Sequence, residues 1–204
     1  MNNNYTDITI VLDRSGSMES TRTDAEGGFN NFITEQNKLP GKCLVSLHQF
    51  DDKFETVYEG KPLSEVPKLS LIPRNLTALL DAVGRTVIAT GDRLRKISET
   101  ERPGKVIFII ITDGCENASK EYTREKVKEL IEHQRTEYSW QFVFIGADAN
   151  TFNEAQNLGI LPASTFNYAN TSAGTQSMYN SITKSTTNYR TGKTKDMTLN
   201  NKQN

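Results

Sequence analysis

Two segments of the chain are almost continuously apolar, and each is followed by an aspartate. Residues 8–12 read Ile-Thr-Ile-Val-Leu and precede Asp13, while residues 106–112 read Val-Ile-Phe-Ile-Ile-Ile-Thr and precede Asp113. A strand without a polar face is typical of a parallel sheet that is covered on both sides. The pattern predicts two buried strands, over residues 6–12 and 106–112, that each place a carboxylate at their carboxyl end.

Other periodicities predict the remaining elements. Alternating or apolar runs bounded by turn residues predict strands at residues 43–50, 54–58, 140–145 and 164–168. Apolar residues at helical spacing predict helices at residues 24–37, 77–97, 121–136, 150–158 and 173–189. The buried side of the helix at 77–97 is expected to contain Leu80, Val83, Val87, Ile88 and Leu94.

The alternation of strands and helices predicts an α/β fold. We expect a Rossmann-like, doubly wound and mostly parallel six-stranded sheet, with one antiparallel edge strand and helices on both faces. In the strand order 3-2-1-4-5-6, the strands that precede Asp13 and Asp113 are neighbours. Ligands of such sheets bind beyond the carboxyl ends of the strands, where the strand order reverses. The two aspartates should therefore converge.

The turn after the first strand is rich in oxygen ligands. Asp13-Arg14-Ser15-Gly16-Ser17 offers one carboxylate and two hydroxyls within five residues. Oxygen-only ligands suit a hard divalent cation such as Mg²⁺ or Mn²⁺, whereas zinc prefers imidazole and thiolate. Cellular availability favours Mg²⁺ as the cofactor.

Three short motifs, taken in order, resemble the metal-ion-dependent adhesion site of von Willebrand factor A (VWA) domains. They are Asp13-x-Ser15-x-Ser17, Thr77 within residues 75–82, and Thr112-Asp113-Gly114. The resemblance covers roughly residues 5–190 and points to the small, stand-alone bacterial and phage VWA proteins, including those of tellurite-resistance type. The chain resembles the secreted adhesion domains less, because flanking disulfides and a signal segment are missing from the sequence.

The resemblance implies a role for each motif residue. Ser15 and Ser17 would bind the cation through their hydroxyls, and Asp13 would hold coordinating water and orient the serine turn. Thr77 would bind directly in a ligand-bound state, and Asp113 directly or through water. The implied function is a non-catalytic, metal-dependent protein-binding module, in which an acidic side chain of the partner completes the coordination. An ATPase, a kinase or a phosphatase of the same system is the kind of partner that the family suggests.

Two other function classes have weaker support. A metal-dependent phosphoryl-transfer enzyme would need an attacking aspartate and a lysine or arginine that reaches the phosphate. No histidine is placed as a base for a serine nucleophile, and neither GxSxG nor GxxxxGK occurs. Nucleic acid could contact the basic residues near the C-terminus, although a solvated tail is the favoured interpretation. Those residues are Lys184, Arg190, Lys193, Lys195 and Lys202.

Several side chains near the motifs have open roles. Arg14 and Glu116 either steer a partner or are solvated charges beside the site. Asp81 is expected to support the loop or the start of its helix and not to bind the metal. The cysteines, Cys43 and Cys115, form no zinc pattern, and we expect reduced thiols.

Composition narrows the class further. The chain has 204 residues and a formal net charge of −1, which gives no broad basic field for nucleic acid. No segment approaches the length of an apolar membrane span, and the N-terminus lacks the pattern of a signal peptide, so we expect no membrane contact and a cytoplasmic protein. We expect one VWA domain over residues 1–192 and a polar, poorly ordered tail over residues 193–204.

Overall fold

The protein forms one six-stranded sheet in the order β3-β2-β1-β4-β5-β6. The structure is a computed structural model that describes residues 1–199. β3 runs antiparallel to β2 at one edge, and the other neighbouring strands are parallel. The strands are β1 (Asn2–Asp13), β2 (Lys42–Phe50), β3 (Phe54–Pro62), β4 (Pro103–Thr112), β5 (Gln141–Gly146) and β6 (Thr165–Asn167).

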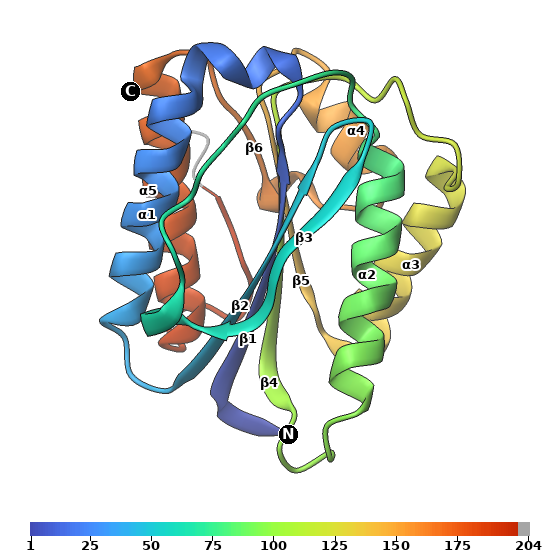
Figure 1. Ribbon diagram of the computed structural model, residues 1–204. Helices are drawn as coiled ribbons and strands as arrows, with labels where there is room; N and C mark the ends of the chain where they lie inside the picture. The colour runs from blue at the N-terminus through green and yellow to red at the C-terminus, as the bar shows by residue number, and fades with distance from the viewer. Residues whose placement is uncertain (200–204) are drawn as a thin grey trace.

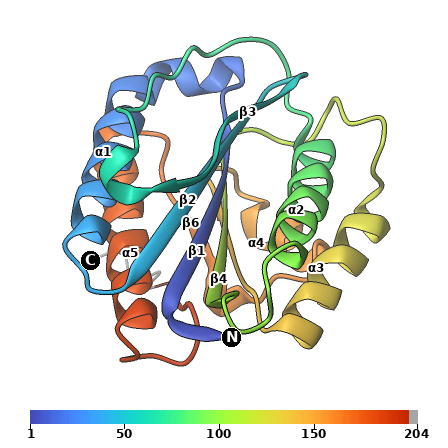
Figure 2. The same cartoon turned by 60° about the horizontal axis from the view of Figure 1, so that its bottom comes forward.

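Helices cover both faces of the sheet (Figure 1). α1 and α5 lie side by side on one face, and α2 and α3 lie on the other, as the tilted view in Figure 2 also shows. This arrangement confirms the predicted doubly wound fold. The helices are α1 (Arg22–Asn37), α2 (Leu79–Arg95), α3 (Arg124–Tyr138), α4 (Thr151–Asn157) and α5 (Ser172–Arg190).

Each face of the sheet has its own hydrophobic core, because successive side chains of a strand point to opposite faces. On one side Ile10 packs in the same cluster as Phe29 of α1 and Met178 of α5. On the other side the cluster contains Val11 and Val83, together with residues from α3 and α4. The central strands are thus buried on both faces, as their apolar sequence predicts.

The helix α2 differs from its prediction in two respects. It begins at Leu79 with Ala78 as the N-cap residue, so Thr77 precedes the helix and is not its first residue. Ile88 was expected on the buried side, but its side chain is 40% exposed. Neighbouring helix positions point about 100° apart, and Val87 is the one that faces the core.

Residues 193–199 differ from the expectation of a poorly ordered tail. The side chains of Met197 and Leu199 are buried in the α1–α5 core cluster. The backbone N–H of Met197 donates to Gln141 Oε1 at 2.9 Å, and that of Leu199 donates to the carbonyl of Ala163 at 2.8 Å. Two apolar residues thus fix a segment whose composition is otherwise polar. The last part of the predicted tail, residues 200–204, lies outside the described residues.

Two further expectations concern single features of the chain. Cys43 and Cys115 are both free thiols, as predicted. Within residues 1–199, every helix is too short or too polar to cross a lipid bilayer.

Candidate metal centre

The two strand-end aspartates lie at the same edge of the sheet, because β1 and β4 are parallel neighbours. Asp13 ends β1, and Asp113 directly follows β4. The hydroxyl of Ser17 donates to Asp113 Oδ1 at 2.5 Å, and the Oγ atoms of Ser15 and Ser17 are 3.1 Å apart. A hydrogen bond therefore links the serine turn after β1 directly to the aspartate after β4.

The hydroxyl of Thr77 lies beside Gly114, close to the hydroxyls of Ser15 and Ser17. A Cβ atom placed on Gly114 would lie 2.9 Å from Thr77 Oγ1 and 3.6 Å from the Oγ atoms of Ser15 and Ser17. The absent side chain leaves a small cradle that three hydroxyls surround, with the Asp113 carboxylate bonded to one of them. Every donor around this cradle is an oxygen, which fits a hard divalent cation.

Asp13 faces the protein with both carboxylate oxygens. Oδ1 accepts a hydrogen bond from the backbone N–H of Ser15 at 2.6 Å, and Oδ2 accepts from Thr112 Oγ1 at 2.6 Å. The residue is fully buried. Its geometry fits the implied role of orienting the serine turn. The contribution of Thr112 was not predicted, although a hydroxyl residue directly before Asp113 was visible in the sequence.

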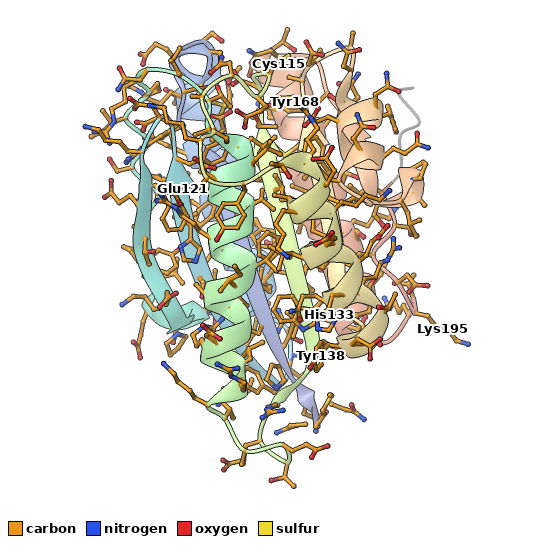
Figure 3. The ribbon with its side chains drawn as sticks, turned by 90° about the vertical axis from the view of Figure 1, so that its right-hand side faces the viewer. Cys115, Glu121, His133, Tyr138, Tyr168 and Lys195 are labelled. Atoms are coloured by element: carbon orange, nitrogen blue, oxygen red, sulfur yellow. The ribbon has the colours of Figure 1, made fainter. Side chains whose placement is uncertain are left out.

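Asn170 is a second residue of the site that the sequence did not reveal. Its side-chain amide donates to Asp113 Oδ2 at 3.1 Å from the segment between β6 and α5, 57 residues further along the chain. With Ser17 on Oδ1, both oxygens of Asp113 have a partner. Tyr168, three residues after the start of β6, is at the same end of the molecule as Cys115 in Figure 3. No local pattern in the sequence points to Asn170.

Backbone hydrogen bonds hold the three motif loops together. The N–H of Gly16 donates to the carbonyl of Asn75 at 3.2 Å, and Asn75 has the left-handed φ of 58° that asparagine tolerates. The N–H of Thr77 donates to Asn117 Oδ1 at 2.9 Å, while the N–H of Asn117 donates back to the carbonyl of Thr77 at 3.0 Å. The loop that carries Thr77 is thus fixed to both neighbouring loops.

The charged residues beside the motifs stabilise these loops. Arg14 is buried and donates to Glu55 Oε2 at 2.6 Å, so it is not displayed to a partner. Glu116 accepts hydrogen bonds from the backbone N–H groups of Leu80 at 2.9 Å and Ser119 at 2.8 Å. Neither expected alternative, a steering group or a solvated charge, describes Arg14, and both residues stabilise the loops.

Asp81 supports a loop, as expected. Its carboxylate accepts hydrogen bonds from the backbone N–H groups of Lys120, Glu121 and Tyr122, each at 2.9 Å. It therefore anchors the segment that leads into α3 and makes no contact with the hydroxyls of the cradle.

Burial makes the charges of the two site aspartates costly. It raises the pKa of Asp13 to about 6, against the opposing effect of the hydrogen bonds from Thr112 and Ser15. Burial also raises the pKa of Asp113, while hydrogen bonds from Ser17 and Asn170 act in the opposite direction. Among residues 1–199, no lysine or arginine forms an ion pair with either carboxylate. A nearby cation would favour the charged form of both.

Solved structures of similar fold come from distant organisms. Proximal thread matrix protein 1 from the mussel byssus matches with a TM-score of 0.62 at 17% identity, over 88% of this chain and 45% of that chain. The ArnB paralog VWA2 from Sulfolobus acidocaldarius matches with a TM-score of 0.56 at 20% identity, over 88% of this chain and 44% of that one. The chain has the fold of a VWA domain.

A third similar structure is the manganese-loaded TRAP protein of Plasmodium vivax. It matches with a TM-score of 0.53 at 17% identity, over 79% of this chain and 65% of that chain. The chain thus spans less than half the length of the mussel and archaeal VWA structures and about two thirds of the length of TRAP. No family model and no curated protein sequence matches the chain, so the likeness to VWA domains is one of fold.

Proposed function

We propose that this VWA domain is a non-catalytic protein-binding module that depends on Mg²⁺ or Mn²⁺. Ser15, Ser17, Thr77 and Asp113 would hold the cation, and Asp13 would orient the serine turn. The bound ion would offer a coordination position to an Asp or Glu carboxylate of the partner protein. The observation that carries the proposal is the cradle at Gly114, where three hydroxyls meet beside a carboxylate.

The electrostatics of the site support a cation as the missing component. The buried carboxylate of Asp13 and the partly buried carboxylate of Asp113 lie close together, and the hydrogen bonds to them come from neutral donors. Burying an unpaired charge is strongly unfavourable. A divalent ion beside Asp113 would offset that cost without any change in the fold.

The similar structures are consistent with a metal at such a site. One structure of the mussel protein has a zinc-occupied MIDAS motif, and the TRAP structure is manganese-loaded. For this chain we favour Mg²⁺ or Mn²⁺, because the described donors around Gly114 are oxygen atoms. Zn²⁺ is titrated beside these two ions in the experiment below.

The same geometry argues against phosphoryl transfer. Both oxygens of Asp13 are used by hydrogen bonds within the protein, so this residue is poorly placed to attack a phosphate. Arg14, the nearest arginine in the sequence, is bonded to Glu55 and lies close to Asp51. An enzyme of that class would need a free basic group at the site.

The basic C-terminal residues give little support to nucleic-acid binding. Arg190 donates to the carbonyl of Gln36 at 2.7 Å, so its guanidinium faces the protein. Lys202 lies outside the described residues. We therefore propose an acidic protein segment as the ligand, with an ATPase, kinase or phosphatase of a cytoplasmic bacterial or phage system as the class of partner.

A metal titration tests the first half of the proposal. Isothermal titration calorimetry with Mg²⁺, Mn²⁺ and Zn²⁺ should show one binding site in the wild type. The Ser17→Ala variant should lower the affinity for Mg²⁺ by at least about 10-fold. Ser20→Ala is the matched control, because Ser20 is an exposed serine of the same short helix that bonds only to the carbonyl of Ser17. Equal affinities in all three proteins would refute the site.

Asp13→Ala tests the orienting residue. We expect loss of Mg²⁺ binding together with a lower melting temperature, because the buried Ser15 N–H loses its acceptor and an unsatisfied group costs about 1–3 kcal/mol. The Thr112 hydroxyl also loses its bond to Asp13 but keeps the carbonyl of Gly114 as an acceptor, at 3.0 Å. Differential scanning calorimetry with and without Mg²⁺ separates the two effects. If Mg²⁺ raises the melting temperature of Asp13→Ala as much as that of the wild type, the proposed role is wrong.

A pull-down from host lysate tests the second half. Wild type in Mg²⁺ is compared with wild type in EDTA and with Ser17→Ala in Mg²⁺. A protein that is recovered in the first sample alone is the expected metal-dependent partner. Identical proteins in all three samples would show that partner recognition does not use the metal.

A further inference from the structure

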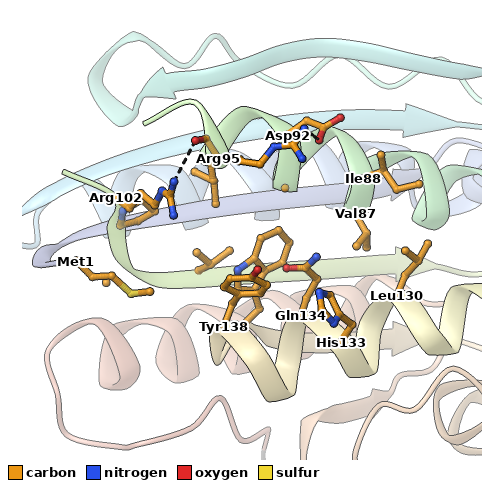
Figure 4. A pocket seen from close by; sticks show the side chains of 16 residues that line it. Met1, Val87, Ile88, Asp92, Arg95, Arg102, Leu130, His133, Gln134 and Tyr138 are labelled. Atoms are coloured by element: carbon orange, nitrogen blue, oxygen red, sulfur yellow. Dashed lines mark hydrogen bonds and ion pairs between the residues drawn. The ribbon is translucent and has the colours of Figure 1, made fainter. Parts of the chain in front are cut away.

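A pocket of about 310 Å³ lies between α2 and α3, next to the start of β4 (Figure 4). Figure 3 shows its residues His133 and Tyr138 at the end of the molecule opposite to Cys115, which follows the metal site. This volume is at the lower end of the range for small-molecule sites. The pocket shares no residue with the candidate metal centre.

The lining of the pocket combines apolar and aromatic side chains with polar and charged ones. Val87 of α2, Leu130 of α3 and Trp140 before β5 line it, and the indole of Trp140 stacks on Phe142 with ring centroids 6.2 Å apart. Ile88, the helix residue that the sequence placed in the core, lies in this lining and stays 40% exposed. Ile88 therefore leaves apolar surface uncovered at the pocket, whereas Val87 and Trp140 are almost completely buried.

Arg102 gives the pocket a fixed positive charge. Its Nε donates to the carbonyl of Ile97 at 2.8 Å and its Nη2 to the carbonyl of Arg95 at 3.0 Å, which holds the guanidinium at the C-terminus of α2. No carboxylate among residues 1–199 pairs with it, and its Nη1 has no partner there. Arg95 is the other arginine of the lining, and its charge is balanced by Asp92 at 2.9 Å. Of the two arginines in the lining, Arg102 is thus the one without a carboxylate partner.

Gly91 keeps the pocket open at a cost to the helix. A glycine inside an α-helix is less stable than an alanine at the same position. A Cβ atom on Gly91 would meet only Gln134 Nε2, at 3.8 Å, which is an ordinary contact. Packing within the protein does not require the glycine. A larger side chain at this position would enter the pocket.

We propose that this pocket binds a planar aromatic anion of about two fused rings. The rings would lie against the exposed side chains of Ile88 and Tyr138, and the anionic group would accept hydrogen bonds from Arg102. The aromatic and apolar lining, the single unbalanced guanidinium and the volume agree on this class of ligand. The site is independent of the proposed metal centre, because the two lie at opposite ends of the sheet.

The fluorescent aromatic anion anilinonaphthalene sulfonate (ANS) is the probe for the first experiment. Trp140 is the single tryptophan of the chain, so energy transfer from it to ANS reports binding. The Gly91→Leu variant then decides whether the bound ANS is in this pocket. We expect saturable binding with one ANS per chain, unchanged by Mg²⁺ or EDTA. Gly91→Leu should weaken it by at least about 10-fold because the leucine fills the pocket. Gly91→Ala is the matched control and should stay within about 3-fold of the wild type.

A pair of ligands tests the charge without altering the protein. Naphthoate and naphthylmethanol have the same rings, but naphthoate alone carries a negative charge. Naphthoate should displace ANS at concentrations about 10-fold lower than naphthylmethanol, because a charge-assisted hydrogen bond to Arg102 is available to it. Equal displacement would overturn the assignment to anions. ANS binding that does not saturate, or that survives Gly91→Leu unchanged, would overturn the pocket itself.

Discussion

β1 carries two buried aspartates with opposite surroundings. Near its beginning, Asp7 accepts two hydrogen bonds from the guanidinium of Arg93, at 2.8 and 2.7 Å. At its end, Asp13 accepts from the Ser15 N–H and the Thr112 hydroxyl, which are both neutral donors. The two residues are equally buried and six positions apart in the same strand.

The contrast shows which buried carboxylates the protein pairs with its own arginines and which it does not. A buried carboxylate is stable when it is paired, and α2 supplies the cation for Asp7. The same is true of Asp51, which is close to the candidate metal centre and pairs with Arg14 and Arg74. Arginines are therefore available near the site, yet the fold directs them away from Asp13 and Asp113. This difference supports the proposal that a cation from solution completes the site.

Removal of Arg93 should have the largest effect on stability. Arg93→Met keeps the aliphatic part of the side chain but leaves Asp7 buried and unpaired, so the free energy of unfolding should fall by about 3–5 kcal/mol. Urea denaturation measures this loss. Arg95→Met, in the same helix and with its charge exposed, should cost less than about 1 kcal/mol. Equal losses would mean that Asp7 does not depend on its partner.

A methyl group in the cradle should have the next largest effect. Gly114→Ala places a Cβ atom 2.9 Å from Thr77 Oγ1 and close to both serine hydroxyls, so we expect Mg²⁺ affinity to fall by about 100-fold. Calorimetric titration measures the affinity, and the melting temperature in EDTA serves as the control for folding. Unchanged Mg²⁺ binding would place the cation elsewhere.

Asn170→Ala should have a smaller effect at the same site. The variant removes the hydrogen bond to Asp113 Oδ2 but leaves the proposed ligands in place, so Mg²⁺ affinity should fall by about 10-fold. Asn153→Ala, another asparagine at this end of the sheet, is the control and should bind Mg²⁺ like the wild type. A loss in the control as large as that in Asn170→Ala would show that the effect is not specific to Asp113.

Gly91→Ala should have the smallest effect and the opposite sign. Because its Cβ atom has room, the variant should raise the free energy of unfolding by about 0.5–1 kcal/mol. Thermal unfolding measures this change. The same measurement on Gly114→Ala compares the effect of an added methyl group at the two ends of the sheet. A destabilised Gly91→Ala would show that the helix needs glycine here for a reason other than the open pocket.

The sequence alone indicated the fold and most of the candidate site for local reasons. Hydrophobic periodicity marks strands and helices, and a parallel α/β sheet has few ways to order its strands. The residues from Asp13 to Ser17 are neighbours in the chain, so their joint turn was visible. Asp113 could be predicted in the same way, because it directly follows an apolar strand.

Contacts between distant segments decided the rest. Thr112 bonds to Asp13 across 99 residues and Asn170 bonds to Asp113 across 57, and neither pairing leaves a trace in local composition. The burial of Met197, the exposure of Ile88 and the pairing of Arg14 with Glu55 likewise depend on which element packs nearby. Local pattern determines which way a backbone segment folds, whereas the partner of a polar or apolar side chain is set by the packing of the whole sheet and its helices.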